Sequence, residues 1–286
     1  MVGQKALGAL FGVLAGAMWA LEAVLGKMLL SSLNFLQVAA SESIFASLTS
    51  LVYILLTNKN LRVKRVHLKD ILIIGLVGSF LAPIAYFLGL TLTFAVNATL
   101  LAHIQPLFVS FLGFFLLGER IRRNDVFGGL MIGVAAVLIT GRSIENLFSL
   151  KFGNLGDLTV LFATFCWAIV AIPGKRLTKY INSVLIVFYR FLMASAAFII
   201  LLLILGEFTI GFASQVFLGV IVGLGYIFYY EGLKRLKASQ AALTELSSPL
   251  FTALLAWFIL GEYTTAMQIA GALLLIVGLV TLTREK

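Results

Sequence analysis

The chain has 286 residues, of which 61% are hydrophobic and 12% charged, whereas an average soluble domain carries about 25% charged residues. This composition excludes an ordinary soluble globular protein. The net charge of +9 does not indicate a nucleic-acid partner, because the basic residues lie in short segments between apolar runs, where they orient a chain in a membrane. One cysteine, Cys166, and two histidines, His67 and His103, argue against an internal disulfide and a multi-histidine metal centre. We expect neither a metal nor a cofactor.

Ten apolar segments follow one another, separated by charge clusters and turn residues. Each approaches the roughly 20 residues with which a helix crosses a bilayer. A β-barrel would instead need short segments that alternate apolar and polar residues. The sequence therefore predicts an all-α polytopic protein of the lipid bilayer with ten transmembrane helices, at 6–30, 35–56, 70–90, 95–117, 124–141, 157–178, 183–205, 213–233, 238–260 and 265–283.

The basic residues are divided unequally between the two sides of this arrangement. Of the 21, 17 lie on the side that holds both termini, and Lys27, Arg142 and Lys151 lie on the other, with Arg190 inside a span. Cytoplasmic loops carry the excess of Lys and Arg in membrane proteins. We therefore expect a multi-pass protein of the plasma membrane with its N- and C-termini in the cytoplasm.

The second half of the chain repeats the first. Residues 96–140 match residues 239–283 at a fixed offset of 143, and Trp19 and Lys27 match Trp167 and Lys175 at an offset of 148. The pairs that keep the offset of 143 include Pro106/Pro249, Gly118/Gly261 and Glu119/Glu262. A shared spacing of this kind is typical of an internal repeat.

Each repeat holds five predicted helices, which is an odd number, so the second copy must cross the membrane in the opposite direction. Inverted repeats of this kind are the architecture of many secondary transporters. We expect a first five-helix repeat at 1–141, an external linker at 142–156 and a second, inverted repeat at 157–286.

Trp19 with Lys27, the block from Pro106 to Glu119, and their counterparts in the second half resemble the EamA type of the drug/metabolite transporter superfamily. The resemblance implies a ten-helix fold of two inverted repeats around a central cavity, in a family with many exporters of amino acids and other metabolites. The chain departs from the family pattern at two positions. Ala20 stands where many relatives have Gly, and Glu42 stands where many have a basic residue, although its equivalent Arg190 fits the pattern. No relative's substrate is therefore transferred to this chain.

Ionisable residues within spans are costly in lipid and usually face a cavity or a partner. Glu22 lies near the middle of the first span on the same helical face as Trp19, so we expect it to line a cavity, with a buried pair in the bundle as the alternative. Glu42 lies nearer the end of its span, and we expect its side chain to reach the interface or to hydrogen-bond locally.

A polar stripe runs along the ninth span, where Glu245, Ser248 and Thr252 share one face. Pro249 has no N–H to donate to the carbonyl of Glu245, which leaves an acceptor beside the carboxylate. This pair of acceptors is a candidate cation or ammonium site. The alternative is hydrogen bonding between helices.

The fourth span repeats this pattern with Thr99, His103 and Ser110 on one face, and Pro106 frees the carbonyl of Ala102. His103 can titrate near physiological pH or simply donate a hydrogen bond. We assign Pro106, Pro249, Glu119 and Glu262 to structure, because the two carboxylates can cap the N-terminus of the helix that follows each of them.

Arg190 can hold a substrate carboxylate through two hydrogen bonds, or can pair permanently with Glu42 or Glu245. Trp19, Trp167 and Tyr86 are candidate aromatic walls of a cavity, because aromatic faces attract an ammonium group.

The sequence predicts a secondary transporter, not an enzyme, that exports a small polar metabolite, an amino acid or an amine, by alternating access. The predicted substrate-binding residues are Trp19, Glu22, Tyr86, His103, Trp167, Arg190 and Glu245. Glu22 and Glu245 are candidates for exchanging a proton with substrate, because burial favours the neutral form of a carboxyl group. The alternatives are a nucleotide-sugar or sugar-phosphate exchanger and a membrane channel or receptor. The sequence does not specify the substrate, the coupling ion, the direction or the oligomeric state.

Overall fold

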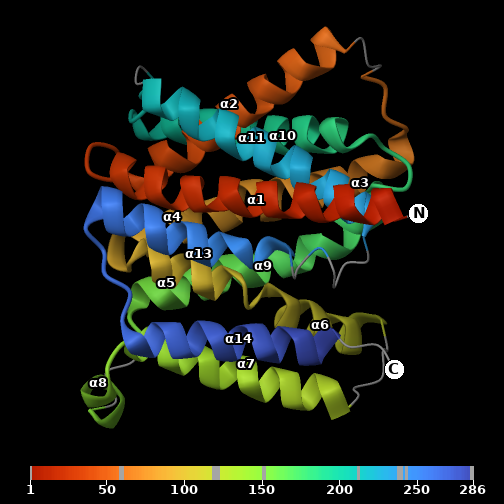
Figure 1. The fold of residues 1–286 in the computed structure, drawn as a ribbon. Helices are drawn as coiled ribbons and strands as arrows, with labels where there is room; N and C mark the ends of the chain where they lie inside the picture. The colour runs from red at the N-terminus through yellow and green to blue at the C-terminus, as the bar shows by residue number, and fades with distance from the viewer. Residues whose placement is uncertain are drawn as a thin grey trace.

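The computed structural model describes residues 2–57, 61–117, 123–149, 153–210, 213–236, 241 and 244–283, and these ranges form helices and no strand (Figure 1). The helical segments are α1 (Val2–Leu29), α2 (Phe35–Leu56), a 3₁₀ turn (Arg65–His67), α3 (Leu68–Ile73), a π-helical stretch (Ile74–Leu81), α4 (Ala82–Leu92), α5 (Ala95–Ala102), α6 (Gln105–Leu117), α7 (Arg123–Gly141), α8 (Ile144–Phe148), α9 (Leu155–Leu177), α10 (Ser183–Leu205), α11 (Ala213–Arg235), α13 (Ser247–Leu255), a second π-helical stretch (Ala256–Leu260) and α14 (Ala266–Thr283).

Helices of the two halves pack against each other in matching pairs. Helix α1 packs on α11, α4 on α9, α2 on α10 and α7 on α14. Figure 1 shows α7 and α14 side by side, and it shows that α1 begins and α14 ends at the same end of the bundle. Gly219 permits the close approach of α11 to α2, because a Cβ there would lie 2.2 Å from the Cβ of Phe45.

The first helices of the two halves run in opposite directions. Lys27, in the last turn of α1, donates to the carbonyl of Thr93, and the hydroxyl of Thr93 donates to Asp157 in the first turn of α9. The C-terminus of α1 and the N-terminus of α9 therefore lie at one end of the bundle, which we call the Lys27 end. We call the opposite end, where α9 finishes, the Lys175 end.

Local sequence signals start the helices at matching positions. The side chain of Asn34 accepts from the backbone N–H of Gln37 and caps α2, and Asn182, which lies 148 residues later, accepts from the N–H of Val184 and caps α10. Asparagine is among the best N-cap residues because its side chain satisfies a free N–H of the first turn. These caps agree with the offset of 148 seen in the sequence.

Seven helical segments are long and apolar enough to cross a membrane, and three shorter apolar helices accompany them at 126–141, 247–260 and 266–281. The shorter helices fall within the fifth, ninth and tenth predicted spans. A count of ten spans therefore stays a prediction.

The fourth predicted span, 95–117, is not one continuous helix. It breaks at His103 and Ile104, between α5 and α6, and the second half has a matching non-helical residue at Leu246, before α13. Both breaks lie three residues before a proline, Pro106 or Pro249, which lacks an N–H and disfavours a helical conformation in the residue before it.

Candidate substrate-binding cavity

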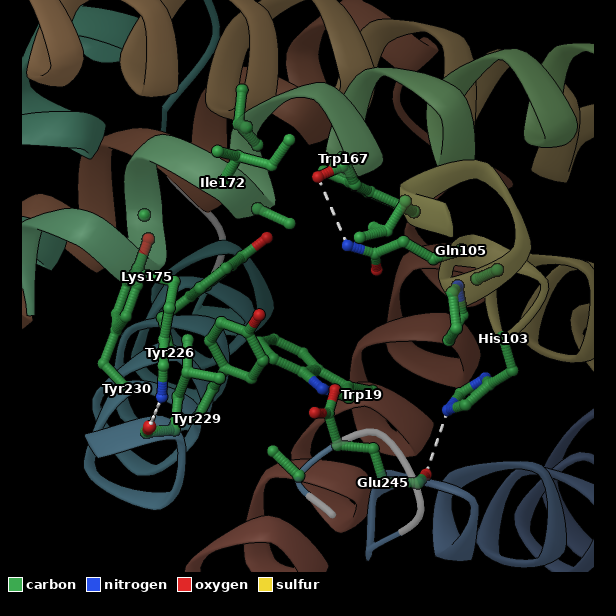
Figure 2. Close-up of a pocket in the computed structure, with 18 of the residues that line it drawn as sticks. Trp19, His103, Gln105, Trp167, Ile172, Lys175, Tyr226, Tyr229, Tyr230 and Glu245 are labelled. Carbon is green, nitrogen blue, oxygen red and sulfur yellow. Dashed lines mark hydrogen bonds between the residues drawn. The ribbon is translucent and has the colours of Figure 1, made fainter. Parts of the chain in front are cut away.

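A cavity of about 580 Å³ lies between the two halves. Its walls come from α1, α4, α5 and α6 of the first half and from α9, α10, α11 and the segment before α13 of the second (Figure 2). All seven residues that the sequence marked for substrate binding line it: Trp19, Glu22, Tyr86, His103, Trp167, Arg190 and Glu245. The structure thus brings these residues together, and their role in binding stays a prediction.

Glu245 presents its carboxylate to the cavity beside an aromatic wall. The indole N–H of Trp19 is directed at this carboxylate (Figure 2). The Trp19 ring packs edge-on against Tyr226 of α11, with 4.7 Å between ring centroids. One acid therefore shares a wall with two large rings.

His103 joins the two helix breaks. Its Nδ1 lies 2.7 Å from the carbonyl oxygen of Thr99 in its own half, and its Nε2 lies 2.9 Å from the carbonyl oxygen of Glu245 in the other half. The second contact crosses the interface between the repeats (Figure 2). This contact bears on one expectation from the sequence: the carbonyl that Pro249 frees has His103 Nε2 beside it, so that side of the oxygen is not open to a substrate cation.

The polar stripe of the ninth span is divided in the structure. Glu245 lines the cavity, whereas Ser248 and Thr252 are fully buried outside its lining. Their hydroxyl oxygens have no hydrogen-bond partner among the described residues. In the fourth span, Thr99 and Ser110 line the cavity together with His103.

Arg190 on α10 directs its N–H groups at protein acceptors. Nε donates to the hydroxyl of Ser79 at 2.7 Å, and the two terminal nitrogens donate to the hydroxyl of Tyr230 at 3.2 Å and to the carbonyl of Gly78 at 3.3 Å. The guanidinium also lies over the ring of Tyr226, 3.9 Å from its centroid.

These contacts bear on both alternatives that the sequence left open for Arg190. In the described part of the chain, the ion pairs within 4.0 Å are Arg176 with Asp70 and Arg235 with Glu231, so Arg190 pairs with neither Glu42 nor Glu245 at that distance. With three of its nitrogens already directed at protein oxygens, Arg190 is also poorly placed to hold a substrate carboxylate through two parallel bonds.

The carboxyl groups of Glu22 and Glu42 both interact electrostatically with the guanidinium of Arg190. Glu22 is 8% exposed and lines the cavity, and its carboxylate interacts electrostatically with Arg190 and with Glu42. Glu42 is only 2% exposed. The expectation that Glu42 reaches the interface is therefore wrong: α10, α11 and α4 pack around α2 and enclose it.

Two clusters of rings form the remaining walls. Tyr86 and Trp167 have ring centroids 5.4 Å apart, and the indole N–H of Trp167 donates to the carbonyl of Gly78 at 3.1 Å. Tyr226, Tyr229 and Tyr230 on α11 form the second cluster. The sequence analysis did not select this cluster, although the spacing of 226, 229 and 230 places all three rings on one helical face.

Two further polar residues of the lining also escaped the sequence analysis. Gln105 donates to the carbonyl of Trp167 at 3.2 Å and so connects α6 with α9. Lys175 donates to the carbonyls of Leu233 and Leu236 at the C-terminus of α11. A cation at this position is favourable because the last carbonyls of a helix lack partners within the helix.

The residues assigned to structure lie as follows. Glu262 accepts from the backbone N–H groups of Ala95 at 3.1 Å and Val96 at 3.4 Å, so it caps the N-terminus of α5 in the other half and not that of the helix that follows it. Glu119 lies outside the described residues. Pro106 lines the cavity, and Pro249 is buried at the start of α13.

A buried polar network lies at the Lys27 end, outside the cavity. The hydroxyl of Thr93 and the amide of Asn97 donate to Asp157 at 2.6 and 3.4 Å, and Gln268 donates to Asn97 at 2.5 Å. The cavity lining instead extends from Glu22 toward the Lys175 end. Among the described residues, no group of three acidic, His or Cys side chains is placed to hold a metal ion.

Comparison with known proteins agrees with this architecture. A solved crystal structure superposes with a TM-score of 0.68 at 21% identity over 96% of both chains, which supports the fold. The chain is 26% identical to the pseudopaline exporter CntI of Pseudomonas aeruginosa over 98% of this chain and 96% of the relative. It is 27% identical to the riboflavin transporter ImpX of Fusobacterium nucleatum over 65% of each chain, and 27% identical to the uncharacterized transporter YyaM of Bacillus subtilis over 73% of this chain and 71% of the relative.

The model of the EamA-like transporter family matches the chain twice, at residues 6–141 and 154–284. The two matches cover the two halves that pair in the bundle. This membrane protein therefore belongs to the EamA-like transporter family.

Proposed function

We propose that this protein is a secondary transporter that exports a small amine-bearing metabolite, an amine or an amino acid, by alternating access. In this proposal the chain crosses the plasma membrane ten times as two inverted five-helix repeats, 1–141 and 157–286, joined by an external linker at 142–156, with both termini in the cytoplasm. The antiparallel directions of α1 and α9 and the twofold family match support the inverted arrangement.

The observation that carries the proposal is the difference between the basic and the acidic side chains of the cavity in what they contact. The bases Arg190, Lys175 and His103 all direct N–H groups at protein oxygens. The carboxyl groups of Glu22 and Glu245 line the cavity among aromatic rings. Acidic oxygens and aromatic faces both attract an ammonium group, so the site favours a cationic amine over an anion.

The same difference disfavours a nucleotide-sugar or sugar-phosphate exchanger, because a phosphate needs basic donors that are free to bind it. Relatives named as a pseudopaline exporter and a riboflavin transporter support a transporter of small organic molecules over a channel or a receptor.

The conformation also fits export. The cavity extends from mid-bundle toward the Lys175 end, while the network around Asp157 joins the two halves at the Lys27 end. By the positive-inside rule, the Lys175 end faces the cytoplasm. The structure then corresponds to a state that loads substrate from the cytoplasm.

Three compounds that share one ring test the charge preference: tyramine, tyrosine and 4-hydroxyphenylpropanoate. A ligand raises the thermal midpoint of the purified protein according to its occupancy of the folded state. We expect the largest increase with tyramine, a smaller one with tyrosine and none with the deaminated acid. Equal or greater stabilisation by the deaminated acid would reject the preference of the site for a cationic amine. Counterflow of labelled tyramine in proteoliposomes then separates a transporter from a channel, because a channel only equilibrates its substrate.

A further inference from the structure

A second acid lies next to the cavity without lining it. Glu42 on α2 is 2% exposed, and its Oε2 atom is buried without a hydrogen-bond partner among the described residues. The cavity lining includes Glu22 but not Glu42. The two carboxyl groups interact electrostatically, so the charge of one affects the charge of the other.

The titratable and charged groups that interact electrostatically with Glu42 are Glu22 on α1, Tyr86 on α4, Arg190 on α10 and Tyr226 on α11. This environment therefore holds two acids and one permanent cation. The N–H groups of Arg190 that have partners are directed at Ser79, Tyr230 and Gly78, so they do not satisfy the buried oxygen of Glu42.

A buried carboxylate oxygen that lacks a donor is costly when charged, and two carboxylates in one environment repel each other. One arginine balances one of the two negative charges. A single proton on the acid pair makes the whole cluster neutral, and it removes the charge from the oxygen that has no donor. The neutral acid is best placed at Glu42, since Glu22 has access to the cavity.

We propose that Glu42 is the proton-storage site of the transporter and that Glu22 passes this proton to and from the cavity. The inference rests on the proposed function and deepens it, because it adds a coupling ion, the proton, and names the acid that holds it. When a substrate ammonium binds beside Glu22, the proton leaves Glu42 through Glu22 to water in the cavity. The cluster with the bound ammonium is then neutral again, so one proton is exchanged for one cationic amine.

The proton itself can be detected without any substrate. Infrared difference spectra between wild type and Glu42→Gln at pH 7 should contain the carbonyl band of a protonated carboxyl group. The exposed acid Glu145 provides a control, since Glu145→Gln makes the same chemical change away from the cluster. Loss of ionised-carboxylate bands alone, or loss of the protonated band in Glu22→Gln but not in Glu42→Gln, would overturn the assignment.

Transport tests the coupling. In proteoliposomes with an acidic interior and a gradient of one pH unit, the wild type should move tyramine inward several-fold faster than protein-free liposomes do, where only the neutral amine crosses the bilayer. Glu42→Gln should keep tyramine counterflow at equal pH but should lose this acceleration by the pH gradient. Acceleration by Glu42→Gln to the wild-type level would reject proton storage at Glu42. Absence of wild-type counterflow would instead reject the proposed function, while the infrared band still decides the protonation of Glu42.

A further measurement covers the case in which Glu42→Gln does not fold. Tyramine added to wild-type protein in weakly buffered detergent solution should release about one proton per amine bound, as reported by a pH-sensitive dye. Glu42→Asp keeps a carboxyl group and should retain this release. Binding of tyramine with no proton release from the wild type would overturn the proposal.

Discussion

Lys27 and Lys175 hold equivalent places in the two halves of the bundle and make equivalent contacts. Lys27 Nζ donates to the carbonyl of Thr93 at 2.6 Å, just after α4, and Lys175 Nζ donates to the carbonyl of Leu236 at 3.2 Å, just after α11. The lysines are 148 residues apart and the carbonyls 143. In each half, one lysine therefore connects the first helix to the C-terminal end of the third helix through hydrogen bonds.

This relationship predicts a stability effect. Replacing Lys27 by Met removes the donor and leaves the carbonyls of Leu90 and Thr93 unpartnered at a helix end, which should cost about 1 to 3 kcal/mol. The thermal midpoint should fall by several degrees. Lys5→Met, at an exposed position of α1, is the control and should leave the midpoint unchanged. An unchanged midpoint for Lys27→Met would show that the contact contributes nothing to stability.

The internal repeat made much of the architecture predictable. The offsets of 143 and 148 anticipated the paired prolines, the paired lysines and the opposite directions of α1 and α9. Apolar runs located most helices, because lipid requires a long apolar surface and internally satisfied backbone groups. The break at His103 was not predicted, because hydrophobicity is continuous across it and only Pro106, three residues later, indicates it.

The candidate site could be predicted as a set of residues but not in its contacts. Ionisable residues in spans are rare, so Glu22 and Arg190 stood out from their surroundings. The partners of Arg190 and the burial of Glu42 depend on which helices pack together, and the sequence of a helix that is apolar on all sides does not specify this. Tyr226 was missed because aromatic residues are also common on lipid-facing surfaces, so the residue type alone does not indicate a place in a cavity.

His103 should stabilise the interface between the repeats. His103→Phe keeps a ring of similar size but removes the imidazole N–H that a carbonyl of Thr99 or Glu245 accepts, so it should cost about 1 to 3 kcal/mol. His103→Gln retains one donor group and should lose less. Thermal unfolding of the three proteins measures the order, and a Phe variant as stable as wild type would remove His103 from the interface.

Glu22 and Glu245 should each be needed for binding. Glu22→Gln and Glu245→Gln remove a negative charge with little change of shape, so each should lower tyramine counterflow at least about tenfold, the factor that corresponds to about 1.4 kcal/mol. Both variants should unfold near the wild-type temperature. Glu145→Gln is the matched control at an exposed acid. Normal counterflow in both variants would disprove the site, and failure of both to fold would favour a structural role.

The proposed orientation can be tested by labelling. In a Cys166→Ser background, a cysteine in place of Asn146 should react with an impermeant reagent added to intact cells. Cysteines in place of Asn60 and Lys286 should react only after permeabilisation. The opposite pattern would reverse the orientation, and labelling of the two chain termini from different sides would contradict an even number of spans.

The network at the Lys27 end should hold this conformation closed on that side. Asp157 Oδ1 accepts from Thr93 and Asn97, and Asp157 Oδ2 accepts from the backbone N–H of Asn154 at 3.1 Å. Asp157→Asn replaces one acceptor oxygen by a donor and removes the negative charge. Either orientation of the new amide breaks part of the network, so the balance between conformations should shift toward one that opens at the Lys27 end.

A cysteine in place of Ala171, which lines the cavity, reports this shift. In the Cys166→Ser background, Asp157→Asn should raise its labelling rate from outside the cell several-fold, since one lost charge-assisted hydrogen bond of about 1.5 kcal/mol changes a two-state ratio roughly tenfold. Asp70→Asn makes the same chemical change beside Arg176 at the opposite end, and it should not raise external labelling. If both variants label alike, the substitution loosens the bundle in general, and Asp157 does not act as a closure specific to the Lys27 end.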